Sequence, residues 1–134
     1  MQLEKLHKSD KLSSVRKQIY ILDDDESVRR SIKLMMESYG FEVDEFSSAE
    51  EFFRSVPNSA PGCLILDIHL EGLNGWQTLQ RLMETGSTRP VVVITADRDE
   101  SFKQKALKAG AVGFLRKPFE DHYLRHMVNR VFNQ

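Results

Sequence analysis

Short runs of almost entirely apolar residues are the feature that most limits the fold of this sequence. They occupy residues 19–22, 63–66, 91–94 and 111–115. A strand with one face in water would alternate apolar and polar residues, so continuous apolar runs predict strands covered on both faces, as in parallel sheets. A less regular strand is expected at residues 41–46. Helical patterns alternate with the runs, and together they predict one α/β domain with a doubly wound parallel sheet.

The helices between the strands are predicted from apolar residues at helical spacing. The stripes are Val28, Ile32, Met35, Met36 and Tyr39; Trp76, Leu79, Leu82 and Met83; Phe102, Ala106, Leu107 and Ala109; and Leu124, Met127, Val128 and Val131. Ser47-Ser48-Ala49-Glu50 carries a capping-box pattern, which predicts a shorter helix after the second strand.

Acidic residues directly follow two of the apolar runs. Asp23 and Asp24 follow the first run, and Asp67 follows the run at residues 63–66. The carboxyl ends of parallel strands lie at one edge of a sheet, so these carboxylates could converge on one site. Neighbouring carboxylates repel one another, and an oxygen-only ligand set favours a hard cation such as Mg²⁺ or Mn²⁺. The alternative is that the acids after the first run cap the next helix, and the residues alone leave this open.

Two further functional groups follow the remaining runs. Thr95 follows residues 91–94, and Lys117 comes shortly after the last run. A single carboxylate such as that of Asp67 can be the nucleophile in phosphoryl transfer and form an aspartyl phosphate. A metal ion, an ammonium group and a hydroxyl group would then contact the phosphoryl oxygens and offset their charge.

The order of these residues resembles that of bacterial two-component response-regulator receiver domains. The matching segments are Leu22-Asp23-Asp24-Asp25-Glu26, Leu66-Asp67 with Gly75 following, Ile94-Thr95-Ala96 and Lys117-Pro118-Phe119. The resemblance covers residues 18–132. It implies a flavodoxin-like (βα)5 fold with strand order 2-1-3-4-5. It also implies a signalling switch phosphorylated by a histidine kinase or a phosphotransfer protein, and not a classical enzyme.

The resemblance implies a role for each site residue as well. The metal ligands would be Asp23, Asp24, Asp67 and the backbone carbonyl of His69. Asp67 would accept the phosphoryl group, and Thr95 and Lys117 would contact it. Thr95 and Phe114 would form the conformational switch. The Lys117–Pro118 peptide bond is often cis in the family.

The sequence departs from the family pattern after the acceptor, where Leu70-Glu71 stands in place of a common Met-Pro. The missing proline removes one φ restraint from the loop, and Glu71 adds negative charge near the site. Output is expected at a surface formed by the fourth helix, fifth strand and fifth helix, through a partner or a homodimer. Candidate contact residues are Phe102, Lys105, Arg116, His122 and Arg125.

Composition agrees with a single globular domain. The chain has 134 residues, of which 40% are hydrophobic and 29% charged. Its net charge of -1 gives no broad attraction to nucleic acid. The single cysteine, Cys63, lies in an apolar run and is expected to be buried and reduced. With no apolar stretch of membrane-spanning length and no signal peptide, we expect a soluble cytoplasmic protein.

Residues 1–17 lie outside the resemblance and are expected to form a flexible extension, while residues 18–132 form the receiver domain. We expect no effector domain in this chain, so it is either a stand-alone receiver or a fragment of a longer regulator. Two other functions remain open. One is an aspartate-nucleophile phosphatase, although such enzymes generally carry a second aspartate where His69 stands. The other is a degenerate receiver that serves only as an interaction module.

Overall fold

The structure is a computed structural model that describes residues 17–70 and 74–133. Its strands are β1 (Gln18–Leu22), β2 (Glu42–Phe46), β3 (Cys63–Asp67), β4 (Val91–Thr95) and β5 (Gly113–Arg116). Its helices are α2 (Glu26–Ser38), α3 (Ala49–Ser55), α4 (Gly75–Glu84), α5 (Ser101–Lys108) and α6 (Asp121–Phe132). The strands form one parallel sheet in the order β2-β1-β3-β4-β5. This confirms the predicted flavodoxin-like fold and strand order.

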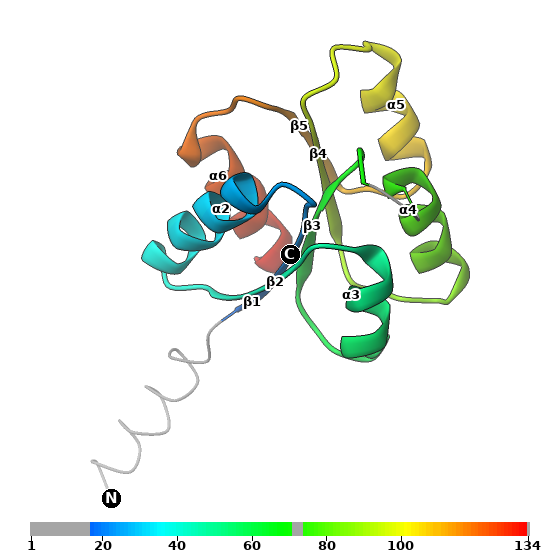
Figure 1. Ribbon diagram of the computed structural model, residues 1–134, viewed down its shortest axis with the longest axis horizontal. Coiled ribbons are helices and arrows are strands. Elements are labelled where there is room, and N and C mark those ends of the chain that lie inside the picture. The colour runs from blue at the N-terminus through cyan, green and yellow to red at the C-terminus, as the bar shows by residue number, and fades with distance from the viewer. Residues whose placement is uncertain (1–16, 71–73, 134) are drawn as a thin grey trace, which may run out of the picture.

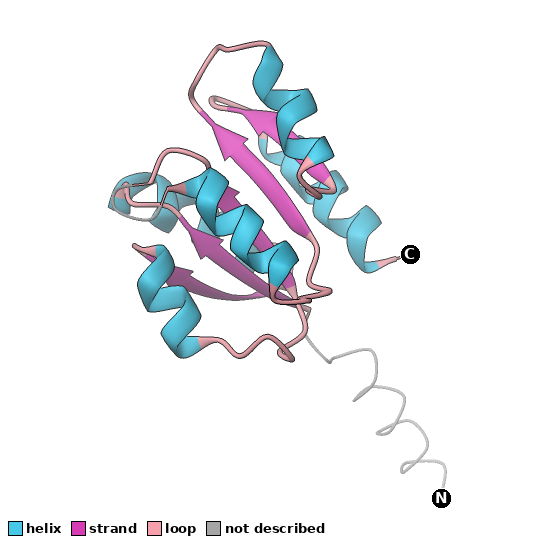
Figure 2. Ribbon diagram, turned by 90° about the vertical axis from the view of Figure 1, so that its right-hand side faces the viewer, coloured by secondary structure: helices cyan, strands magenta, loops and turns pink. Residues whose placement is uncertain are grey.

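The helices cover both faces of the sheet. Figure 1 shows α2 and α6 on one face and α3, α4 and α5 on the other, and Figure 2 shows the strand arrows pointing the same way. Strands β3 and β4 are buried along their whole length. Two apolar cores result, because alternate residues of the same strands point to opposite faces. This burial explains why the runs in the sequence are continuously apolar.

The edge strand β2 is less completely buried than the inner strands. Val43 packs into one apolar core and Phe46 into the other, whereas Glu42 and Asp44 are exposed and Glu45 is half-buried. Polar residues therefore interrupt the apolar run. The sequence signal for β2 was therefore weaker than for β3 and β4.

Helix α3 begins one residue later than the sequence pattern suggested. Its N-cap is Ser48, whose hydroxyl accepts the N–H of Glu51 at 3.2 Å. Glu51 reaches back to the Ser47 hydroxyl, which donates to its Oε2 at 3.1 Å. A reciprocal capping box occurs instead at the start of α4, between Asn74 and Gln77.

Some residues of the predicted apolar stripes lie at the surface. Tyr39 and Met83 are each 37% exposed and Leu107 is 43% exposed, whereas Ile32 and Met36 are buried. Tyr39 lies just past the end of α2, where it forms the C-cap. Helical spacing alone did not separate these residues from the core.

The first described residue already belongs to the domain. The Lys17 carbonyl accepts the N–H of Glu42 at 3.1 Å, so ordered pairing begins one residue before β1. The expected extension otherwise lies outside the described residues, as does Glu71. Cys63 is fully buried at the start of β3, as predicted. None of the described helices is long and apolar enough to cross a membrane.

Candidate functional site

Three carboxylates meet at the carboxyl edge of the sheet, as the sequence predicted. One oxygen from each of Asp23, Asp24 and Asp67 lies within 4.8 Å of the other two. Asp67 ends β3 and Asp23 directly follows β1, the neighbouring strand, and both are buried, whereas Asp24 is exposed. Within residues 17–70 and 74–133 this is the one cluster of three or more His, Cys, Asp or Glu residues that could hold a metal ion.

Lys117 bridges two of the carboxylates. Its Nζ donates to Asp23 Oδ2 at 2.7 Å and to Asp67 Oδ2 at 3.2 Å. The peptide bond from Lys117 to Pro118 is cis, and the Lys117 N–H donates to the Thr95 carbonyl at 2.7 Å. Burial disfavours the ammonium charge, but the contacts with Asp23 and Asp67 outweigh it and hold the pKa of Lys117 above its ordinary value. The lysine therefore stays charged at the site.

The Asp67 carboxyl group is in an environment that disfavours its charge. Burial, together with repulsion from Asp23, raises the pKa of Asp67 to about 6, although the contacts with Lys117 and the His69 N–H act in the other direction. The His69 N–H donates to Asp67 Oδ1 at 3.0 Å. Near neutral pH the group is mostly ionised, yet its charge is only partly compensated.

The donor set fits a hard divalent cation. All three side chains offer carboxylate oxygens, the ligands that Mg²⁺ and Mn²⁺ prefer, and the exposed Asp24 leaves the cluster open to water, which Mg²⁺ usually keeps as a ligand. The family's further ligand, the His69 backbone carbonyl, lies in the loop that follows Asp67. Its contact with a metal stays a prediction.

The third acid of the triplet has a structural role. Asp25 is the N-cap of α2, and its Oδ1 accepts the N–H groups of Ser27 and Val28 at 2.9 and 3.2 Å. The Ser27 hydroxyl also donates to Asp25 Oδ1, at 2.8 Å, and this bond together with the N–H bonds holds the pKa of Asp25 below its ordinary range. The two interpretations that the sequence left open therefore apply to different residues: Asp25 caps the helix, and Asp23 and Asp24 face the site.

Thr95 lies at the end of β4 and is fully buried. Its Oγ1 accepts the N–H of Asp97 at 3.0 Å, and Asp97 Oδ2 lies 2.9 Å from His69 Nε2. The loops after β3 and β4 are thus joined by a His69–Asp97 contact that the sequence did not predict. Asp97 stands two residues past Thr95, but no pattern in the sequence indicated that it would meet a residue 28 positions away.

Phe114 lies on β5 next to this strand end. It pairs in register with Val93, is buried, and has the Arg116 guanidinium 5.1 Å from its ring centre. Among the output-surface candidates, Lys105 and His122 are exposed. The Arg125 guanidinium instead lies over the ring of Tyr39, the C-cap residue of α2, 4.7 Å from the ring centre.

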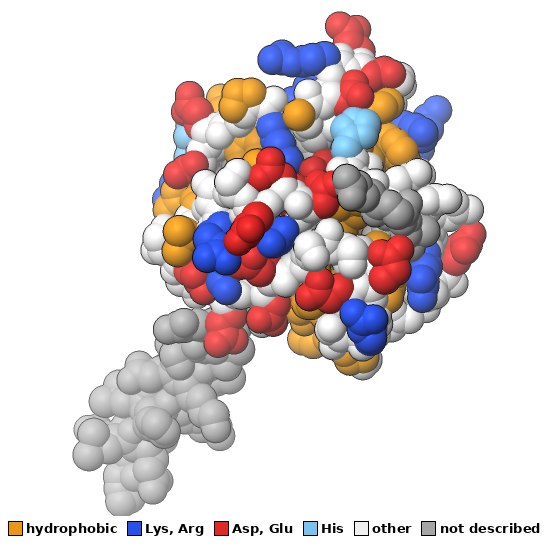
Figure 3. Space-filling view, in the orientation of Figure 1, with side chains coloured by type: hydrophobic (Ala, Val, Ile, Leu, Met, Phe, Trp, Pro, Cys, Tyr) orange, Lys and Arg blue, Asp and Glu red, His pale blue; other side chains and the backbone are white. Residues whose placement is uncertain are grey.

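Beside Lys117 a groove opens between α2 and the turn that joins β5 to α6. Its volume is about 560 Å³. It is lined by Ser27, Val28, Ser31, Ile32, Met35, Ala96, Lys117, Pro118, Phe119 and Asp121. The lining is mainly apolar away from Lys117. Figure 3 shows that the face viewed in Figure 1 carries acidic and basic side chains intermixed.

Comparison with known proteins gives one consistent result. Residues 19–129 match the response regulator receiver domain. The chain is 36% identical over 116 residues to the transcriptional regulatory protein FixJ of Bradyrhizobium diazoefficiens, covering 87% of this chain and 57% of FixJ. It is 41% identical over 118 residues to the response regulator protein TodT of Pseudomonas putida, covering 88% of this chain and 50% of TodT. The chain thus spans only about half the length of these relatives.

Solved structures of related proteins are also similar to this chain. The structure of FixJ-N superposes with a TM-score of 0.81 and 34% identity, covering 88% of this chain and 94% of that one. Full-length FixJ from B. japonicum gives a TM-score of 0.82 and 36% identity, covering 88% of this chain and 58% of that one. Chemotaxis protein CheY4 of Vibrio cholerae, at 21% identity and a TM-score of 0.79, shares the fold.

Proposed function

Because this chain belongs to the response regulator receiver domain family, we propose that it is a phosphorylation-dependent switch that accepts a phosphoryl group on Asp67. The donor is a phosphohistidine of a histidine kinase or a phosphotransfer protein. The observation that carries the proposal is the Lys117 bridge between Asp23 and Asp67. The bridge brings the Asp67 carboxylate, an ammonium group and the acidic pair Asp23 and Asp24 together at one strand edge. Phosphoryl transfer to a carboxylate requires groups of these kinds.

In the proposed reaction the Asp67 carboxylate attacks the phosphorus atom of the donor. A bond from the Asp67 carboxylate oxygen to phosphorus forms, and the phosphorus–nitrogen bond to the donor histidine breaks. Lys117 neutralises charge on the phosphoryl oxygens. Asp23, Asp24, Asp67 and the His69 carbonyl would hold Mg²⁺ or Mn²⁺, which supplies further charge neutralisation when bound. The product is an acyl phosphate that water hydrolyses slowly, so the chain is not a turnover enzyme.

The groove beside Lys117 supports docking of a protein donor. It opens next to the reacting groups and offers apolar residues of α2, with Pro118 and Phe119, for contact. We also place the protein in the bacterial cytoplasm, because its single cysteine is a buried thiol suited to a reducing compartment. FixJ is a transcriptional regulatory protein. In this chain the net charge of -1 favours output through protein contacts over direct binding of nucleic acid.

Intact mass spectrometry after incubation with Mg²⁺ and a small phosphodonor tests the proposal. Wild type should gain the mass of one phosphoryl group, and Asp67→Asn should gain none, because the amide is not a nucleophile. The exposed Asp44→Asn on β2 is the matched control and should label like wild type. Labelling that persists in Asp67→Asn would place the acceptor elsewhere. An unlabelled wild type would instead favour a module used only for interaction.

A further inference from the structure

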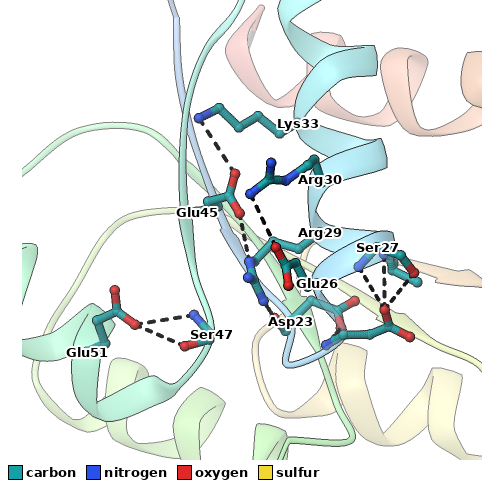
Figure 4. Close-up of polar contacts among 11 residues, drawn as sticks. Asp23, Glu26, Ser27, Arg29, Arg30, Lys33, Glu45, Ser47 and Glu51 are labelled. Atoms are coloured by element: carbon teal, nitrogen blue, oxygen red, sulfur yellow. Dashed lines mark hydrogen bonds and ion pairs between the residues drawn. The ribbon is translucent and has the colours of Figure 1, made fainter.

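Arg29 joins the acidic site to the edge of the sheet. Its Nη1 donates to the Asp23 backbone carbonyl at 2.9 Å, and its Nε donates to Glu45 Oε1 at 2.8 Å (Figure 4). The side chains of Arg29 and Glu45 are only 12% and 20% exposed. One guanidinium thus connects the first turns of α2 with β2 and with the residue that follows β1.

The Asp23 carbonyl needs a donor because the neighbouring strand ends beside it. Leu22 pairs in register with Phe46, the last residue of β2, and the Asp23 N–H still donates to the Phe46 carbonyl at 3.2 Å. Beyond Phe46 the chain turns into Ser48, the N-cap of α3. If the parallel ladder continued, the next backbone N–H of β2 would donate a hydrogen bond to the Asp23 carbonyl. The Arg29 guanidinium donates this hydrogen bond instead.

Glu45 fixes the guanidinium in turn. Its other oxygen lies 3.6 Å from Lys33 Nζ, and the hydrogen bond from Arg29 holds the pKa of Glu45 below its ordinary value. Charge-assisted hydrogen bonds between partly buried groups are stronger than neutral ones. The planar fork of arginine can serve a carbonyl and a carboxylate together, which a lysine ammonium at the same place would do less well.

We propose that Arg29, anchored by Glu45, is a positioning residue for the acidic site. The Asp23 carboxylate accepts the Asp25 N–H at 2.9 Å and the Lys117 ammonium, so its direction depends on the backbone that Arg29 holds. Asp24 is the next residue and depends on the same backbone. The inference rests on the proposed metal-dependent function. Contacts behind metal ligands typically change metal affinity by about 10- to 100-fold.

Titration with Mg²⁺ alone compares Arg29→Ala with Arg30→Ala. Arg30 is the next residue of α2 and loses the same charge, but its ion pair with Glu26, at 3.3 Å, is at the surface. We expect Mg²⁺ to bind Arg29→Ala about tenfold more weakly than wild type or worse. Arg30→Ala should stay within about twofold, since a screened surface charge contributes little. Titration well below the melting temperature of each variant, checked by circular dichroism, separates positioning from unfolding.

Two Glu45 variants provide a conservative rescue. Glu45→Gln keeps an oxygen that accepts from Arg29 Nε and should bind Mg²⁺ nearly as wild type does. Glu45→Ala removes that acceptor and should bind Mg²⁺ more weakly. Equal affinity of the two Glu45 variants would contradict the anchoring role.

Amide exchange at Asp25 without metal tests the positioning independently of the proposed function. The Asp25 N–H is bonded to Asp23 Oδ1, so it should exchange faster in Arg29→Ala than in Arg30→Ala when EDTA is present. Equal exchange in these two variants overturns the proposal, and so does equal Mg²⁺ affinity. If wild type binds no Mg²⁺, the proposed metal-dependent function fails, and the exchange comparison still decides the role of Arg29.

Discussion

Asp67 combines a buried position with the negative charge that the proposed phosphoryl transfer requires. Its neighbours leave that charge partly uncompensated, because burial and Asp23 outweigh the help from Lys117 and the His69 N–H. A group in this state is reactive toward an electrophile but costs folding free energy when ionised. Sites of this kind trade stability for function.

The pH dependence of stability should show this cost. The pKa of Asp67 in the folded state, about 6, lies above its value in the unfolded chain. Between about pH 4 and 6 the folded state therefore binds more protons than the unfolded state, and the free energy of unfolding falls as the pH rises through this range. Above about pH 6 the loss of stability due to the Asp67 charge stays constant. Asp67→Asn should therefore stabilise the metal-free protein at pH 7 by on the order of 1 to 2 kcal/mol after allowance for screening, and much less at pH 4. Urea unfolding in EDTA measures the difference, and a pH-independent difference would contradict it.

Gly75, the first residue of α4, has no room for a side chain. A Cβ there would meet the Ile68 Cα, and would lie 2.6 Å from the Ile68 carbonyl oxygen and 2.7 Å from that of Asp67. These backbone atoms belong to Asp67 and the residue after it, so they cannot move without shifting the Asp67 side chain. Gly75→Ala should thus destabilise the fold by about 1–3 kcal/mol.

Gly113→Ala is the matched comparison for this glycine. Its Cβ would meet the Met127 sulfur, the flexible end of a side chain, so the loss of stability in urea should be smaller than for Gly75→Ala. An equal loss of stability in Gly75→Ala and Gly113→Ala would show that the backbone near Ile68 can shift to make room for the added methyl group.

At the scale of elements, one aromatic contact links the site to two helices. The Trp76 ring of α4 meets the Phe102 ring of α5 edge-on at 5.3 Å, and Lys105 Nζ lies 4.2 Å from the tryptophan ring centre. The Phe102 ring is in turn 6.1 Å from that of His69, which contacts Asp97. A change around Asp67 therefore has a short path to the only tryptophan of the chain.

Tryptophan fluorescence should report this coupling. Adding a beryllofluoride phosphate mimic with Mg²⁺ should change the Trp76 emission, because its surroundings include groups in contact with the loop after the acceptor. Phe102→Leu should reduce the change while phosphorylation measured by mass remains. An unaltered response in Phe102→Leu would mean that the signal reaches Trp76 by another route.

The sequence predicted the inner strands and the residues at their ends, but not the contacts between distant elements. Strands covered on both faces have continuous apolar runs, and so the apolar pattern alone placed Asp67 and Thr95 at the ends of β3 and β4. Arg29 and Glu45 were missed because their contact joins a helix to an edge strand 16 residues away, and neither residue breaks the local pattern. Amphipathic spacing shows which face is apolar but not where a helix end leaves the core, as at Tyr39.

At the scale of the whole molecule, the proposed switch joins Asp67 to the surface formed by α5, β5 and α6 that is expected to carry output. Phosphorylation adds about two negative charges at the strand edge. Thr95 ends β4 at that edge, and Phe114 lies on the neighbouring strand β5, which α5 precedes and α6 follows in the chain. The proposed switch therefore requires these four elements to change together.

Amide exchange with and without beryllofluoride tests that requirement. Protection should change around Asp67 and also across residues 95–123, because a shift of Thr95 toward the mimic leaves space that Phe114 can enter. In Thr95→Ala the change around Asp67 should remain and the change across α5 and β5 should diminish. Changes confined to the loops around Asp67 in wild type would rule out this switch.

The position of Cys63 offers a way to follow how often the folded domain opens. This thiol is fully buried in the central strand, and burial raises its pKa to about 12. Alkylating reagents attack the thiolate, so the folded chain withholds its single cysteine both by access and by ionisation. Modification is confined to molecules whose sheet has opened. The rate at which a thiol reagent consumes the protein therefore measures how often the domain opens, and any ligand that binds only the folded form slows that reaction.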